Sequence, residues 1–160
     1  METVRFLQEQ PLFGGVGDAA MRAIMHLMRP QEFTAGEVIV REGEEGDSLF
    51  VICSGAVEVL KACPAAVDPL GRRIALLSVG DVFGEMELID MQYRSASIRA
   101  LEPVRLVALD NGSLFQIHEA DLPTFTLIVM NLARELSRRL RRIDELAVAV
   151  PAVAAPVTAN

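Results

Sequence analysis

The stretch FGEMELIDMQYRSASIRA, residues 83–100, decides how the rest of the chain is interpreted. It combines a Gly84-Glu85 pair, a second acid at Glu87 and a single Arg94. Gly84 allows an unusual backbone conformation or a close approach. The residues after it make about one helical turn, whose first N–H groups favour an anion. Because the donors of Arg94 match a phosphate, we interpret the stretch as a cradle for a singly charged phosphate diester.

A second interpretation of the same residues involves no ligand. Arg94 can form a surface ion pair with Glu85 or Glu87, worth less than about 1 kcal/mol. Residue spacing alone does not separate this ion pair from a phosphate site, so both interpretations stay open at this point.

The length and charge of the chain limit its classes of function. Its 160 residues suit one domain, or one domain with an appendage. A formal net charge of −7 argues against broad contact with nucleic acid or an anionic membrane. The sequence shows no signal-peptide pattern, no apolar run that spans a membrane, and two cysteines that make no disulfide framework. We therefore expect a cytoplasmic protein with reduced thiols.

Short strands are predicted on both sides of the quoted stretch. From residue 31 onward, glycines divide β-branched runs at intervals of roughly ten residues, as in a meander or jelly roll. An irregular loop with two prolines is expected at 62–71. The predicted fold class is α+β, with about eight antiparallel strands in a β-roll (double-stranded and jelly-roll-like) over residues 31–110.

Helices are predicted before and after this roll. A short N-terminal helix and a Pro-Leu-Phe turn precede a helix over residues 19–29, which Asp18 caps and Pro30 ends. Asp110 starts a short helix after the roll, and residues 122–147 form the longest periodic stretch. The apolar positions of that stretch lie three or four apart: Leu122, Phe125, Val129, Leu132, Leu136, Leu140, Ile143 and Ala147.

The long C-terminal helix is expected to form a homodimer, because half of its stripe can face a partner helix. The alternative is a helix packed wholly on its own roll. Arginines crowd its last turns, where they suit the negative end of a helix dipole. Few residues follow Ala147, so we expect no helix-turn-helix domain and no nucleic-acid binding by this chain alone. Residues 148–160, rich in Ala, Val and Pro, are expected to be a disordered tail.

The quoted stretch resembles the phosphate-binding cassette of cyclic nucleotide-binding domains, F-G-E-x-(small)-L-(several)-R-(S/T/A)-A-x-(V/I)-x-A. AGEVIVREGEEGDSLFVICSGAVEV, residues 35–59, is similar to the glycine-punctuated β-roll of that family. The two C-terminal helices resemble its hinge and lid helices. The resemblance covers roughly residues 5–147. It implies a cyclic nucleotide-binding domain over 1–147, with the roll at about 31–110 and the C-terminal helices at about 111–147.

The resemblance implies a role for each matching position. Arg94 is expected to pair with the cyclic phosphate, and Glu85 to accept from the ribose 2′-OH. The full set implied for phosphate and ribose is Gly84, Glu85, Met86, Arg94, Ser95 and Ala96. Matching an Arg-Arg-Leu run to transcription factors of the family places Ile143 and Asp144 at the base. The set implied for base contact is Val59, Ile74, Ile143 and Asp144.

The resemblance implies cyclic AMP as the ligand, with cyclic GMP as the alternative. Ser95 has a hydroxyl that can bond a guanine, and Asp144 can accept from its N–H groups. Three positions depart from the family pattern: Glu87 replaces a small residue, Tyr93 replaces a proline, and Met91-Gln92 replaces a turn-like pair with glycine. An inward Glu87 carboxylate would repel the ligand, whereas an outward one would be harmless.

The leading hypothesis is a sensor domain without an effector domain of its own, which signals to an unknown effector protein by movement of its lid helix. The alternative is a degenerate β-roll that binds no nucleotide and acts as a dimeric interaction module. A metal-dependent β-roll enzyme is a distant third, because His26 and His118 belong to no ligand pair. We expect no catalytic residues and no metal.

Overall fold

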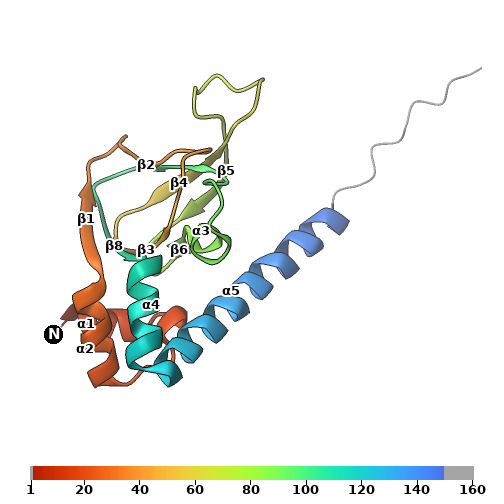
Figure 1. The fold of residues 1–160 in the computed structure, drawn as a ribbon. Helices are drawn as coiled ribbons and strands as arrows, with labels where there is room; N and C mark the ends of the chain where they lie inside the picture. Colours follow the sequence, from red (N-terminus) through yellow and green to blue (C-terminus); the bar gives the residue numbers. More distant parts are fainter. Residues whose placement is uncertain (1, 150–160) are drawn as a thin grey trace, which may run out of the picture.

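The computed structural model describes residues 2–149, in which N-terminal helices, a set of strands and two C-terminal helices follow one another in the predicted order (Figure 1). The helices are α1 (Glu2–Gln8), the 3-10 helix η1 (Pro11–Phe13), α2 (Asp18–Leu27), α3 (Glu85–Asp90), α4 (Asn111–Ala120) and α5 (Leu122–Ala149). The strands are β1 (Arg29–Phe33), β2 (Val38–Val40), β3 (Ser48–Ser54), β4 (Val57–Lys61), β5 (Arg72–Leu77), β6 (Val82–Phe83), β7 (Ser97–Ala100) and β8 (Val104–Asp110).

The eight strands form two antiparallel four-stranded sheets that face each other. One sheet has the order β1-β8-β3-β6 and the other β2-β7-β4-β5. Neighbours in each sheet are mostly distant in sequence, as when β3 pairs with β8 from Ser48↔Asp110 to Ser54↔Arg105. The predicted α+β class and the eight-stranded antiparallel roll are confirmed. The proline-containing loop at 62–71 joins β4 to β5, as predicted.

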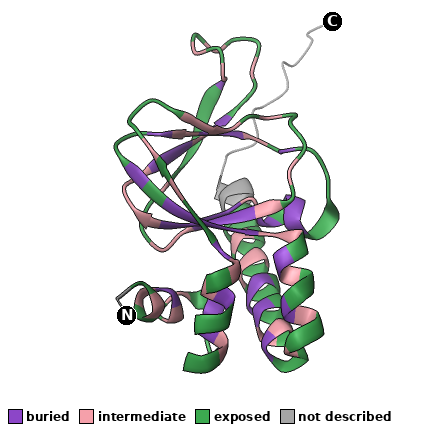
Figure 2. Ribbon diagram, turned by 60° about the vertical axis from the view of Figure 1, so that its left-hand side comes forward, coloured by how far each residue is buried: buried purple, intermediate pink, exposed green. Residues whose placement is uncertain are grey.

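Strand β3 is buried on both of its faces, which explains its continuous apolar sequence. Side chains of successive strand residues point to opposite faces. Phe50 and Ile52 pack inside the roll, whereas Leu49 and Val51 pack against the helices. Figure 2 shows the buried positions along these strands and where the helices meet the roll.

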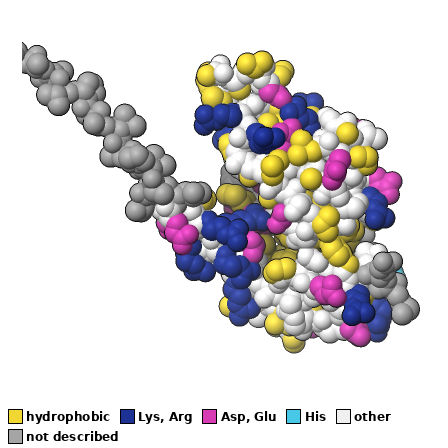
Figure 3. Space-filling view, turned by 180° about the vertical axis from the view of Figure 1, so that it is seen from behind, with side chains coloured by type: hydrophobic (Ala, Val, Ile, Leu, Met, Phe, Trp, Pro, Cys, Tyr) yellow, Lys and Arg dark blue, Asp and Glu magenta, His cyan; other side chains and the backbone are white. Residues whose placement is uncertain are grey.

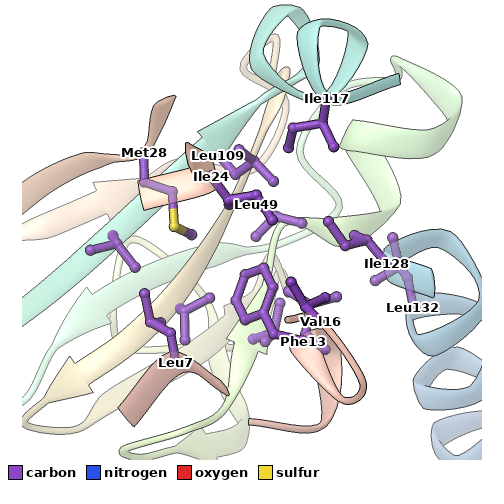
Figure 4. Packing of buried hydrophobic residues seen from close by; sticks show 14 of the residues in the cluster. Leu7, Phe13, Val16, Ile24, Met28, Leu49, Leu109, Ile117, Ile128 and Leu132 are labelled. Atoms are coloured by element: carbon purple, nitrogen blue, oxygen red, sulfur yellow. The ribbon is translucent and has the colours of Figure 1, made fainter. Parts of the chain in front are cut away.

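Besides the hydrophobic cluster inside the roll, another cluster joins the helices to the outer face of the β1-β8-β3-β6 sheet (Figure 4). Phe13 of η1 and Ile24 of α2 meet Leu49 there, and α5 adds Ile128 and Leu132. The predicted stripe of α5 is therefore only partly right in its first half, where Leu132 is buried and Phe125 packs against this cluster. The buried face contains Thr124, Ile128, Asn131 and Leu132, whereas Leu122 and Val129 are exposed. Asn131 belongs to this face because its amide donates to the carbonyls of Leu12 and Gly14.

The N-terminal boundaries also differ from the prediction. Asp18 does not cap α2: Gly17 holds the N-cap position, and Asp18 instead accepts from the side chain of Gln8 across 2.8 Å. The helix ends at Leu27, and Pro30 lies inside β1. Proline fits there because β1 is an edge strand, which pairs only with β8. The roll thus begins at Arg29 rather than at residue 31.

Two C-terminal predictions concern how the helices begin and end. Asp110 caps α4, as predicted, and its Oδ1 accepts from the backbone N–H of Ser113 across 2.7 Å. Helix α5 starts beside α4 and runs diagonally past the roll (Figure 1). It includes residues 148–149 of the predicted tail. The remainder of that tail, 150–160, lies outside the described residues.

Candidate functional site

The quoted stretch forms α3 between β6 and β7, and Gly84 fixes how α3 leaves the sheet. Gly84 has φ 77°, in the left-handed region that favours glycine. A Cβ at this position would lie 2.6 Å from both Arg94 Nη1 and the carbonyl oxygen of Ser48. Glycine is therefore required for two reasons: the backbone has a positive φ, and Arg94 approaches too closely to leave room for a Cβ.

Arg94 is buried in a slot made by two glycines and an aromatic ring. Its side chain is 7% exposed and packs against Gly46, where a Cβ would meet Nε at 2.3 Å. The guanidinium lies over the ring of Phe50, 5.4 Å from its centroid. Nη1 donates to the carbonyl of Ser48 across 2.9 Å. These contacts hold the arginine head in one place, and the sequence interpretation assigned no part in this to Gly46 or Phe50.

Glu87 points inward. Its side chain is 5% exposed, and Oε2 lies 3.3 Å from Arg94 Nη1. Oε1 accepts from the backbone N–H of Ser95 across 2.9 Å. The expected surface ion pair between Arg94 and Glu87 is therefore a buried one. The other expected pair, Arg94 with Glu85, is not present among the described residues.

Glu85 pairs instead with Arg139, which α5 supplies. Arg139 Nη1 donates to Glu85 Oε1 across 2.7 Å, and Nη2 donates to the carbonyl of Val82. Glu85 is 5% exposed, so burial raises the pKa of its carboxyl group, and the nearby Glu87 raises it further. The positive charge of Arg139 opposes that rise.

Sequence analysis missed Arg139, although its position held a signal. Arg139 lies three residues after Leu136 and four before Ile143, which places it on the apolar stripe of α5. The neighbouring arginines are exposed, and three of them contact α5 itself: Arg134 with Asn131, Arg138 with Glu135 and Arg141 with Ser137. Basic side chains gather beside the end of α5 in Figure 3. Helical periodicity thus separates the inward arginine from the outward ones.

These side chains line one cavity of about 640 Å³ between the roll, α3 and α5. Among the predicted residues, the cavity is lined by Gly84, Glu85, Met86, Arg94, Ser95, Ala96, Val59, Ile74 and Ile143. Asp144 is the exception, since it is exposed and not among the lining residues. The predicted phosphate and ribose set is thus in one place, whereas Asp144 lies outside the cavity lining.

The cavity has a charged side and an apolar side. Arg94, Glu85, Glu87 and Ser95 come from the cassette. The apolar wall consists of Val59, Ile74 and Leu77 from the roll and Leu136, Leu140 and Ile143 from α5. Such a cavity fits a ligand with a flat apolar part and an anionic part.

Lys61, at the end of β4 in the same sheet as β7, holds the cassette at Ser95, and sequence analysis missed it. Its Nζ donates to the carbonyl of Ser95 across 2.6 Å and pairs with Glu42 Oε1 at 2.7 Å. This pairing lowers the pKa of the Glu42 carboxyl group. Lys61 also lines the cavity, so three cations, Lys61, Arg94 and Arg139, stand around it, each already paired with a glutamate.

Comparison with known proteins agrees with this geometry. The sequence profile of the cyclic nucleotide-binding domain matches residues 30–121. The chain belongs to that family. A CRP-like cAMP-activated global transcriptional regulator of Mycobacterium tuberculosis is 34% identical over 133 residues, which are 83% of this chain and 56% of the regulator.

Two further relatives show how widely the domain is used. A cGMP-dependent protein kinase of Drosophila melanogaster is 36% identical over 112 residues, covering 69% of this chain and 14% of the kinase. The crystal structure of the Thermus thermophilus catabolite activator protein matches with a TM-score of 0.74 at 33% identity, covering 87% of this chain and 62% of that one. This chain therefore spans about half of the curated regulator that it matches, and far less of the kinase.

The described residues, 2–149, contain no candidate metal site and no helix that could span a membrane. No group of three or more His, Cys, Asp or Glu side chains in that range is placed to hold a metal ion. Cys53 and Cys63 are free thiols. Within the same range, every helix is too short or too polar to cross a membrane.

Proposed function

We propose that this chain is a regulatory sensor domain that binds a cyclic nucleotide in the cavity between its roll and α5. The observation that carries the proposal is Arg94, which is fixed on the charged side of the cavity with only Nη1 engaged. Nε and Nη2 have no hydrogen-bond partner among residues 2–149, and both can donate to a cyclic phosphate.

The other side chains are assigned to the rest of the ligand. Glu85, with the Gly84 backbone, would accept from the ribose 2′-OH, while Ser95 and Ala96 approach the phosphate and Met86 completes the turn. Val59 and Ile74 would form the wall against the purine, and Ile143 would cap it from α5. Asp144 lies outside the cavity lining. Its predicted contact with the base therefore requires a shift of α5.

Cyclic AMP is the proposed ligand, with cyclic GMP as the alternative. The M. tuberculosis relative is described as cAMP-activated and the Drosophila kinase as cGMP-dependent, so kinship supports both. Ser95 lines the cavity and would supply a hydroxyl to guanine. Asp144 lies outside the cavity lining, so its position adds no support for guanine.

The signal would pass through α5. Ligand would join the cassette to α5 and shift the population toward one helix position, in proportion to its differential affinity for the two positions. A second copy and an unknown effector protein would sense that position. The proposed domain has no catalytic role and by itself contacts neither nucleic acid nor membrane, in keeping with its net charge of −7.

One observation favours the second candidate, a dimeric interaction module that binds no nucleotide. The carboxylate of Glu87 already pairs with Arg94 and already accepts from Ser95. If that pairing is permanent, the cavity has no free charge for a phosphate.

Isothermal titration of the purified protein with cAMP and cGMP tests the proposal. Arg94→Leu should weaken binding by about tenfold or more, because a charge-assisted contact to phosphate is lost. Arg105→Leu is the matched control, since Arg105 is an exposed strand arginine that contacts Ser54. No binding of either nucleotide at millimolar concentration, or equal affinity in Arg94→Leu, would reject a nucleotide site here.

A further inference from the structure

Glu87 occupies two of the donors that an anionic ligand would need, one on the side chain of Arg94 and one on the backbone of Ser95. Its carboxylate takes one N–H from the guanidinium of Arg94 at 3.3 Å and the backbone N–H of Ser95 at 2.9 Å. An arginine N–H and a neighbouring backbone N–H that converge on one carboxylate are the same kind of donors that bind a phosphate oxygen. Within the described chain, the carboxylate of Glu87 therefore stands where a ligand anion would be expected.

The pairing with Glu87 explains how the fold tolerates a buried Arg94. A buried guanidinium without a counter-charge is strongly unfavourable. The side chains of Arg94 and Glu87 are only 7% and 5% exposed, so each charge is compensated by the other rather than by water. The remaining cavity cations are also paired, Lys61 with Glu42 and Arg139 with Glu85. Among the described residues, the cavity lining thus offers no uncompensated positive charge.

A second anion cannot simply be added to this arrangement. A phosphate beside Arg94 would lie close to the carboxylate of Glu87 at low solvent exposure, where like charges repel strongly. Glu85 adds another carboxylate to the same wall. Binding therefore requires that the carboxylate of Glu87 moves or is neutralised. This free-energy cost applies to every nucleotide that places a phosphate here.

We propose that Glu87 is an internal competitor for the phosphate position, a built-in anion that a cyclic nucleotide must displace and that lowers the affinity of the site. The inference rests on the proposed function. It removes the apparent conflict between an intact Arg94 slot and an inward acid. The site then responds only at a higher nucleotide concentration than the same cavity would without the acid.

The test compares wild-type protein with Glu87→Gln by titration with cAMP. Glutamine has the same shape and can still accept from Ser95, but it carries no charge. We expect Glu87→Gln to bind cAMP about tenfold more tightly or better, because the like-charge penalty is gone. Asp90→Asn is the matched control: it removes an exposed acid of the same helix and should change affinity less than about twofold.

Adenosine, which has no phosphate, separates competition at the phosphate position from a general change of the cavity. Its affinity should be equal in wild type and Glu87→Gln. Glu87→Ala provides a second neutral variant in case one of the two folds poorly, and thermal unfolding of each protein verifies the fold. An equal gain for adenosine would overturn the inference.

The remaining outcomes distinguish the inference from the function on which it rests. If wild type binds cAMP and both neutral variants bind equally or more weakly, Glu87 only positions Arg94, and the inference fails while the sensor function stands. If wild type shows no binding of cAMP and a neutral variant binds it, the inference is supported. If no protein binds either cyclic nucleotide, both fail together.

Discussion

Arg139 on α5 donates to Glu85 on α3 across 2.7 Å, and the pair joins two segments that are 54 positions apart in the sequence. The second nitrogen of the same guanidinium donates to Val82 at the end of the sheet. One side chain thus fastens α5 to both the cassette and the roll. Because Glu85 is also the proposed acceptor of the ribose hydroxyl, ligand and helix compete for, or share, the same carboxylate.

Arg139→Gln is expected to destabilise the fold by about 1 to 3 kcal/mol, because the mostly buried carboxylate of Glu85 loses its charged partner. Guanidinium-induced unfolding measures the change. Arg138→Gln is the control, since Arg138 is 43% exposed and pairs along its own helix with Glu135. That exposed pair should cost less than about 0.5 kcal/mol. Equal losses in both variants would contradict a special role for Arg139.

Glu85 should make the stability of the protein depend on pH. Burial raises the pKa of its carboxyl group above the ordinary value of 4.5, so between these two values the folded protein holds a proton that the unfolded chain releases. Stability contributed by Glu85 is therefore fully present below pH 4.5 and is lost as the pH rises through the raised value. The Glu85→Gln variant has no titratable carboxyl group at this position, so it lacks this pH dependence.

Unfolding free energies of wild type and Glu85→Gln, measured at several pH values, check this sign. The difference between the two proteins should move in favour of the variant as the pH rises from 4.5. Carboxyl groups common to both proteins cancel in that difference. A difference that is constant with pH, or that moves in favour of wild type, would show that Arg139 outweighs burial.

The roll was predictable because its signals are local. Glycines with positive φ mark turns, as at Gly36, Gly43 and Gly55, and they divide strands of alternating pattern. The boundary near Pro30 was not predictable from local rules. Proline is normally excluded from the interior of a strand. Pro30 is tolerated within β1 only because β1 lies at the edge of its sheet.

The site was predictable for residues that belong to one contiguous motif. Gly84, Arg94 and their neighbours follow from the quoted stretch. Contacts made across the fold did not follow: the direction of Glu87, the bond from Lys61 to Ser95 and the bond from Arg139 to Glu85 depend on tertiary packing. A sequence motif states which groups are present, and the fold decides which of them are already occupied.

The expected homodimer through α5 has a direct test. Val129 and Met130 are exposed apolar residues on that helix, 38% and 47% accessible in the single chain. Light scattering after gel filtration should give about twice the chain mass of 17.4 kDa for wild type. Val129→Glu should shift the protein toward monomer, because a charge at a helix interface is costly. Arg138→Glu, on the opposite side of the helix, is the control, and a monomeric wild type would reject the dimer.

Met91 is expected to be a point of local strain. It is the single non-glycine residue with positive φ in the described range, at 52°, and it lies at the end of α3 where glycine is favoured. Its side chain is 72% exposed, so it contributes little packing. Met91→Gly should stabilise the protein by about 0.5 to 1 kcal/mol, the difference between the strain relieved and the entropy cost of glycine. Chemical denaturation checks this, and Met91→Ala, which keeps a Cβ, should give no such gain.

We expect Asp110 to stabilise α4 near neutral pH, and we expect this stabilisation to be lost at acidic pH. Its carboxylate caps the helix by accepting from the backbone N–H of Ser113, and this hydrogen bond lowers the pKa of Asp110 below the ordinary 3.8. Asp110→Ala should cost about 1 kcal/mol near neutral pH. Because the folded pKa is lowered, the stability that ionisation adds is present above pH 3.8 and is lost as the pH falls through the folded value.

Asp110→Asn separates the cap from the charge. Asparagine keeps an acceptor for Ser113, so this variant should lose much less stability than Asp110→Ala at neutral pH. It also lacks the ion pair with Arg29, whose side chain is 73% exposed and whose contribution is therefore small. Unfolding curves at neutral and acidic pH should show the penalty of Asp110→Ala shrinking in acid, while that of Asp110→Asn stays small throughout. An alanine penalty that persists unchanged in acid would mean that packing around the start of α4, rather than the ionised cap, stabilises the helix.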